Sequence, residues 1–95
     1  MIKIKSIEQK NLPWIVAHRG YRAKFPENTI SAFEGAINAD ADMIELDVCF
    51  SRDRVPVVIH DNTLERTTNG KGFVSEHTLS ELKELDAGSW FSNEF

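Results

Sequence analysis

Apolar residues fall in short runs separated by polar turns, and three of these runs predict strands. Residues 14–18, 43–50 and 55–60 are short and rich in β-branched side chains, which is typical of strands buried in a sheet. Pro56 lies near the start of the third run, where a missing backbone N–H is tolerated. The polar turn at residues 51–54 separates the second predicted strand from the third.

Two further segments have the spacing and caps of helices. Ile30, Phe33 and Ile37 lie three and four residues apart and predict an amphipathic helix of about ten residues. Asn28 or Thr29 is a suitable N-cap for it. A Thr-x-x-Glu capping box at residues 78–81 predicts a second, short helix that runs through Leu85 and stops at residues 86–88. We expect the polar stretch between the third strand and this helix to be a long loop.

The order of these elements gives two conflicting indications about strand direction. A strand, a helix and a second strand in succession favour parallel pairing, as in an α/β sheet. The turn at residues 51–54 is much shorter than a parallel crossover, so by itself it favours an antiparallel hairpin between the second and third strands.

Length, composition and charge limit the class of protein. With 95 residues, 41% of them hydrophobic and 27% charged, the chain suits one small globular domain. The net charge of −4 argues against nucleic-acid binding. The single cysteine excludes an internal disulfide. No apolar run resembles a signal peptide or could span a bilayer, so we expect a cytoplasmic protein with no transmembrane segment. Residues 1–12 are expected to form an arm, and residues 13–95 the domain.

Glu45 and Asp47 alternate with apolar residues in the second predicted strand. Side chains two apart on a strand share a face, which places these carboxylates about 7 Å apart. Unpaired in a partly buried site they would repel, and a divalent cation removes that repulsion. Ligand sets made only of oxygen favour calcium or magnesium. A solvated polar face opposite a packed apolar face explains the same pattern equally well.

His18 and His60 end the first and third predicted strands. If these strands are parallel, both histidines lie at the same carboxyl edge of the sheet, where α/β folds place their sites. Paired imidazoles near a metal suit general acid–base catalysis. A single histidine at a strand end is more often structural, but two that flank a carboxylate pair favour a functional site.

The neighbouring polar residues have both functional and structural interpretations. Arg19 offers a guanidinium fork for phosphate, or a surface ion pair. Asp61 either orients the His60 ring or serves as a turn residue. Cys49 is interpreted as a small buried hydrophobe rather than a nucleophile, and His77 is assigned no role.

Six segments together resemble the motifs of the glycerophosphodiester phosphodiesterase family. None is specific by itself, but they occur in the family's order and at about its spacing. They are residues 17–20 (AHRG), 26–29 (PENT), 44–48 (IELDV), 58–61 (VIHD), 64–68 (LERTT) and 85–91 (LDAGSWF). The chain departs from the family at two turn positions, where Asp40 and Arg54 replace its usual glycines.

The resemblance implies a fold of the α/β class, a TIM barrel. The predicted strands would be its first three, all parallel, so the resemblance sets the hairpin interpretation aside. A TIM barrel takes about 250 residues, so we expect an incomplete barrel with unpaired edges and one uncovered face. Such a fragment should have little activity alone and should tend to self-associate through those edges.

The resemblance also implies metal-dependent hydrolysis of glycerophosphodiesters, which are deacylated phospholipids, to an alcohol and glycerol phosphate. The alternative is a non-catalytic phosphate-binding or orphan fragment of such a domain. In the enzyme interpretation a third acidic metal ligand lies beyond residue 95. The implied roles are general base and general acid for His18 and His60, calcium or magnesium ligands for Glu45 and Asp47, phosphate binding for Arg19, and support for Glu27, Asn28 and Asp61.

Overall fold

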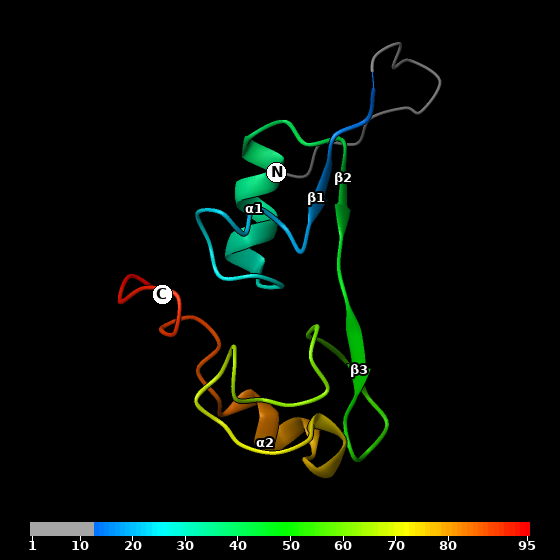
Figure 1. Ribbon diagram of the computed structural model, residues 1–95. Helices are drawn as coiled ribbons and strands as arrows, with labels where there is room; N and C mark the ends of the chain where they lie inside the picture. The colour runs from blue at the N-terminus through cyan, green and yellow to red at the C-terminus, as the bar shows by residue number, and fades with distance from the viewer. Residues whose placement is uncertain (1–12) are drawn as a thin grey trace.

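The computed structural model describes residues 13–95, so the arm predicted for residues 1–12 lies outside the described residues. Two small sheets and the helices packed beside them make up this part of the chain (Figure 1). In chain order the elements are β1 (Val16–His18), α1 (Ile30–Asn38), β2 (Met43–Glu45), β3 (Val48–Phe50), β4 (Pro56–Val58), the 3-10 helix η2 (Val74–Glu76) and α2 (Leu79–Lys83). Neither α-helix in residues 13–95 has the length and apolar character needed to cross a lipid bilayer.

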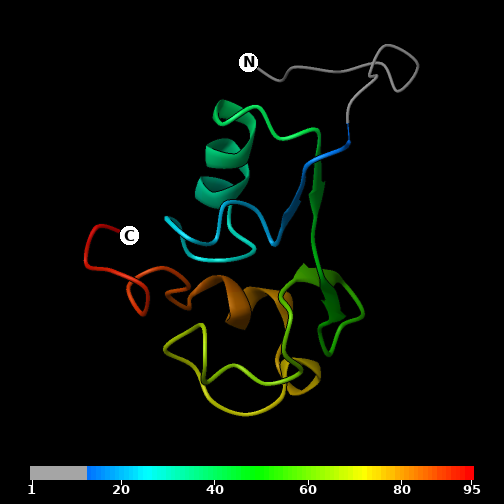
Figure 2. The same ribbon diagram turned by 45° about the horizontal axis from the view of Figure 1, so that its top comes forward.

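The first sheet confirms the predicted strand–helix–strand unit. Strand β1 pairs in parallel with β2, with Val16 opposite Met43 and His18 opposite Glu45. Helix α1 connects the two strands and lies beside them in both ribbon views (Figures 1 and 2). A parallel pair needs such a crossover because the chain must return to the starting edge before the second strand begins.

Helix α1 begins at the predicted cap but buries a different face from the predicted one. Thr29 Oγ1 accepts a hydrogen bond from Ala32 N at 3.2 Å. Ala32 and Ala36 are the buried residues of the helix, whereas Ile30 is 75% exposed. The small alanine face permits a close approach of the β1–α1 loop, since a Cβ on Gly20 would lie 2.7 Å from Ala32 Cβ.

The second sheet shows that the prediction of a parallel third strand is wrong. Strand β4 runs antiparallel to β3, with Val48 opposite Val58 and Cys49 opposite Val57. The single strand predicted over residues 43–50 is interrupted at residues 46–47, and its two parts follow one line in Figure 1. The turn at residues 51–54 closes a hairpin because it is too short for a crossover. Over residues 13–95 the fold class is therefore mixed α/β, with one parallel pair and one hairpin.

A small core supports the hairpin. Ile59, Leu64 and Val74 are buried together, with Cys49, Val57, Leu82 and Leu85 packed against them. The capping box of Thr78 and Glu81 opens α2 as predicted, although α2 ends at Lys83 rather than Leu85. The 3-10 helix η2 was not predicted and lies inside the predicted loop. Several strand side chains remain largely exposed, namely Val16, Met43, Val48, Phe50 and Val58.

The two positions where the family usually has glycine adopt left-handed backbone conformations. Asp40 has φ of 61° and Arg54 has φ of 67°. For a residue with a Cβ this conformation costs roughly 1–2 kcal/mol, and glycine avoids that cost. Asp and Asn tolerate it better than other residues, so Arg54 is the more strained of the two.

We therefore expect Arg54→Gly to stabilise the chain by about 0.5–1 kcal/mol, because strain relief exceeds the entropy that glycine adds to the unfolded state. This corresponds to a rise of about 4 °C in Tm for a domain of this size, measurable by thermal unfolding. Arg52→Gly is the matched control, since Arg52 lies in the same turn without a positive φ. The control should be neutral or destabilising, and a lower Tm for Arg54→Gly would contradict the prediction.

Candidate active site

The carboxyl ends of β1 and β2 place the first histidine beside the first carboxylate. His18 and Glu45 are cross-strand neighbours, and His18 Nε2 lies 3.2 Å from Glu45 Oε2. Arg19 N continues the pairing by donating to Glu45 O at 2.9 Å. Both side chains are half-exposed, so this end of the sheet is open to solvent.

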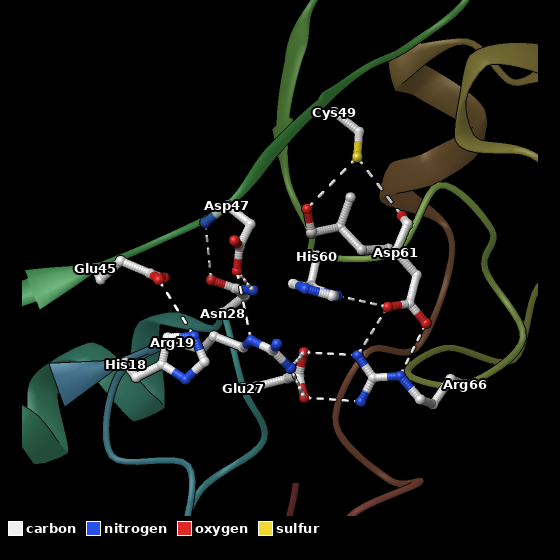
Figure 3. Close-up of polar contacts among 11 residues, drawn as sticks. His18, Arg19, Glu27, Asn28, Glu45, Asp47, Cys49, His60, Asp61 and Arg66 are labelled. Atoms are coloured by element: carbon white, nitrogen blue, oxygen red, sulfur yellow. Dashed lines mark hydrogen bonds and ion pairs between the residues drawn. The ribbon is translucent and has the colours of Figure 1, made fainter.

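His60 reaches the same region by a different route from the predicted one. Because β4 runs antiparallel to β3, the hairpin carries the chain back to the point where β2 gives way to β3. There Ile59 N donates to Asp47 O at 3.0 Å, and His60 is the next residue. Figure 3 shows the His60 ring among the side chains of Asp47, Asn28 and Asp61. The two histidines and the two carboxylates therefore gather at one end of β2 through a hairpin, and the prediction that parallel first and third strands bring them together is wrong.

Asp47 is held in place by a residue of the β1–α1 loop. Asn28 Nδ2 donates to Asp47 Oδ2 at 3.1 Å, and Asp47 N donates to Asn28 Oδ1 at 3.4 Å. Arg19 Nε lies 3.6 Å from the same Oδ2. Asn28 has φ of 56°, a conformation that asparagine tolerates better than most residues. The reciprocal contact fixes the orientation of the Asp47 carboxylate.

Arg66 joins two more of the predicted residues and was missed as a site residue. Its Nη1 and Nη2 atoms each donate to the buried Glu27 carboxylate at 2.9 Å. Its Nε and Nη2 atoms donate to Asp61 Oδ2 and Oδ1 at 2.8 and 3.0 Å. Arg19 Nη1 contacts Glu27 from the other side at 3.3–3.4 Å. Asp61 Oδ1 in turn lies 2.7 Å from His60 Nδ1, so a continuous series of contacts links Arg19 to His60 (Figure 3).

The two arginines keep the supporting carboxylates ionised. Hydrogen bonds from Arg66 lower the pKa of Glu27, outweighing burial, which acts in the opposite direction. Hydrogen bonds from Arg66 and then His60 hold the pKa of Asp61 far below its usual range. Both groups are therefore negative at neutral pH, and each is an acceptor of charge-assisted hydrogen bonds.

The ion pairs of Arg66 with Glu27 and Asp61 predict that the folded chain loses stability in acid. A lowered folded-state pKa adds stability above the unfolded pKa, near 4.5 for Glu27 and 3.8 for Asp61, and that stability is lost as pH falls below these values. We expect the free energy of unfolding, measured with urea, to fall steeply below about pH 4.5. Glu27→Gln should lower stability at neutral pH and flatten the fall, whereas the exposed control Glu84→Gln should change neither. A Glu27→Gln curve parallel to wild type would contradict this assignment.

Glu45 and Asp47 fit a divalent cation as part of its ligand set. Glu45 Oε1 is buried without a hydrogen-bond partner, while Oε2 faces His18. A buried carboxylate oxygen without a partner is costly unless a ligand completes its coordination. Carboxylate oxygens are the ligands that calcium and magnesium prefer. Within residues 13–95, no group of three or more His, Cys, Asp or Glu side chains is arranged to hold a metal ion.

The remaining candidates are structural. Cys49 Sγ lies 3.6 Å from the carbonyl oxygens of Ile59 and Asp61, and burial raises the pKa of its thiol. A protonated thiol is a poor nucleophile, which agrees with its interpretation as a small hydrophobe. His77 Nδ1 lies 2.8 Å from Phe73 O beside η2.

Comparison with known proteins identifies the family. Residues 18–95 match the model of the glycerophosphoryl diester phosphodiesterase family. A glycerophosphodiester phosphodiesterase of Caldanaerobacter subterraneus is 54% identical over 81 residues, which are 85% of this chain and 33% of that protein. The crystal structure of glycerophosphodiester phosphodiesterase from Agrobacterium tumefaciens has a TM-score of 0.87 and 51% identity, covering 88% of this chain and 36% of that one.

An Oleispira antarctica phosphodiesterase, solved in complex with the product sn-glycerol-3-phosphate, has a TM-score of 0.84 and 44% identity over 87% of this chain and 34% of that one. The chain thus spans about one third of the length of the relatives it matches. The family match covers most of the chain, including both histidines and both carboxylates of the site. The chain therefore belongs to the glycerophosphoryl diester phosphodiesterase family.

Proposed function

We propose that the domain containing this chain hydrolyses glycerophosphodiesters to an alcohol and glycerol phosphate, with His18 and His60 as the proton-transfer groups. The observation that carries the proposal is the contact network that joins these histidines to Glu45 and Asp47. His18 contacts Glu45 directly. The backbone oxygen of Asp47 accepts a hydrogen bond from Ile59 N, and His60 is the next residue after Ile59. Acid and base groups within one site suit removal of a proton from water and its return to the leaving alcohol.

Arg19 is placed to bind a phosphate oxygen. Its side chain is mostly buried, and its Nε atom has no hydrogen-bond partner although it faces Asp47 at 3.6 Å. Contacts with Glu27 hold the guanidinium in place without using all of its donors. A fixed guanidinium fork matches the geometry of a phosphodiester. The Oleispira relative, solved with sn-glycerol-3-phosphate, supports a glycerol phosphate moiety on the substrate.

The proposed cation ligands are Glu45 and Asp47. Asp47 Oδ2 is already engaged by Asn28, which leaves Oδ1 for a cation, and Glu45 offers Oε1. A bound calcium or magnesium ion would supply polarisation of the phosphoryl oxygen. Further ligands are needed, because these cations take six or more oxygens. We therefore propose that the 95-residue chain alone turns over slowly or not at all.

A chimera tests the function directly. Residues 18–95 would replace the matching segment of the Agrobacterium enzyme, whose fold superposes closely. Release of glycerol phosphate from glycerophosphocholine would be followed with calcium, with magnesium and with chelator. The chimera should be active with one of the cations and inactive with chelator. A folded chimera without turnover, beside an active host enzyme, would refute catalysis and leave the alternative, a non-catalytic phosphate-binding or orphan fragment of such a domain.

A further inference from the structure

The Arg66 guanidinium is shared between two carboxylates from distant parts of the chain. Glu27 lies in the β1–α1 loop, 39 residues before Arg66, and Asp61 lies directly after His60. Three nitrogen atoms of one side chain make four hydrogen bonds of 2.8–3.0 Å to them. Such a bidentate arrangement fixes orientation as well as distance.

Asp61 transmits this orientation to the His60 ring. Its Oδ1 atom contacts both Arg66 Nη2 and His60 Nδ1. An ionised carboxylate only accepts hydrogen bonds, so the proton in this contact belongs to Nδ1. In the neutral ring, Nε2 is then the atom that carries a lone pair. Figure 3 shows Asp61 between the His60 ring and the Arg66 guanidinium.

Glu27 supplies the fixed end of this arrangement. It is the buried member of the set, with 7% of its side chain exposed, and Arg19 holds it from the opposite side. Arg66 itself is 44% exposed. Without a rigid anchor, a half-exposed arginine would sample many rotamers. The pair of Glu27 and Arg66 therefore determines where Asp61 is held.

We propose that Arg66 is a positioning residue, which through Asp61 keeps His60 in the Nδ1–H tautomer and leaves Nε2 for proton transfer. The proposal rests on the proposed function only in giving Nε2 a catalytic task. The tautomer itself is a property of this chain and can be measured without activity. Lysine cannot replace Arg66, because an ammonium group lacks the planar fork that engages both carboxylates.

Nitrogen NMR of the 15N-histidine-labelled 95-residue chain tests the tautomer. The ring nitrogens of His60 should show the Nδ1–H pattern in wild type above neutral pH. Arg66→Lys, which keeps the charge, should shift His60 substantially toward the Nε2–H form. Arg52→Lys is the matched control, since the Arg52 guanidinium lies 3.9 Å from the exposed carboxylate of Glu81, and it should leave His60 unchanged. Unchanged His77 signals verify that the fold around η2 persists.

A second variant covers the case in which Arg66→Lys does not fold. Glu27→Asp shortens the anchor by one methylene and should produce the same change in tautomer. Retention of the Nδ1–H form in whichever variant folds would overturn the proposal. In the chimera, Arg66→Lys should lower kcat about 10- to 100-fold with little change in KM, as expected for a group that orients a histidine. An inactive wild-type chimera would refute the proposed function but not the NMR result.

Discussion

Replacing His18 or His60 with alanine in the chimera is expected to lower kcat for glycerophosphodiester hydrolysis by about 10²- to 10⁴-fold. Each ring would transfer a proton that water transfers far less efficiently at neutral pH. Both changes remove half-exposed side chains, so the chimera should stay folded, although His60→Ala also removes a hydrogen bond to Asp61 and should lower the free energy of unfolding somewhat more than His18→Ala. Steady-state kinetics on purified variants, with thermal unfolding in parallel, measures the two effects separately.

His77→Ala is the control for these variants. It removes the third histidine of the chain, whose ring contacts the Phe73 carbonyl beside η2. Its kcat should stay close to that of the unchanged chimera. Turnover that survives the loss of either His18 or His60, in a protein with an unchanged melting temperature, would refute the proton-transfer roles.

Local signals in the sequence predicted the elements well because their causes are local. Thr29 and Thr78 cap their helices through bonds that span only three residues. The Ser51–Arg54 turn likewise predicts a hairpin from its length alone. The resemblance to a barrel predicts a parallel third strand, whereas so short a turn permits only the antiparallel pairing of β3 and β4. Chain length between strands was the more reliable physical constraint.

The face buried by α1 was harder to predict. Ile30, Phe33 and Ile37 form the more apolar stripe, yet Ala32 and Ala36 are buried. The loop containing Gly20 approaches α1 so closely that only small side chains fit between them. The spacing of apolar residues indicates which face of a helix is hydrophobic, but it carries no information about how closely a loop approaches that helix. That distance is set by tertiary packing.

The part of the site that was not predicted, Arg66, depends on contacts between residues that are far apart in the sequence. The E-x-D pair could be predicted because it alternates with apolar residues in one run, and the two histidines because each ends an apolar run. Arg66 lies in a polar loop, and the decisive partner, Glu27, is 39 residues away. Residue type alone gives a general indication, since arginine is the residue suited to bridging two carboxylates. The sequence contains several other arginines, so this signal did not distinguish Arg66.

Removing either proposed cation ligand should weaken cation binding. For Glu45→Gln or Asp47→Asn in the chimera we expect the Kd for calcium or magnesium to rise on the order of tenfold or more, because each change removes one negative charge from the ligand set. Isothermal titration measures this Kd directly. Glu34→Gln, which changes an exposed residue of α1, is the matched control and should bind as before.

Thermal unfolding distinguishes cation binding from simple repulsion between the two carboxylates. If the pair binds a cation, added cation stabilises the folded chimera by about 2.7 kcal/mol at a hundredfold excess over Kd, and Glu45→Gln loses most of that gain. If the two carboxylates merely repel each other on a solvated face, the Glu45→Gln chimera is at least as stable as the unchanged chimera when no cation is present. Added cation then raises the stability of neither protein. A melting temperature that does not respond to cation in the unchanged chimera would therefore remove Glu45 and Asp47 from the metal site. Glu45 Oε1 favours the first outcome, because this one oxygen is buried without a hydrogen-bond partner although the side chain as a whole is half-exposed.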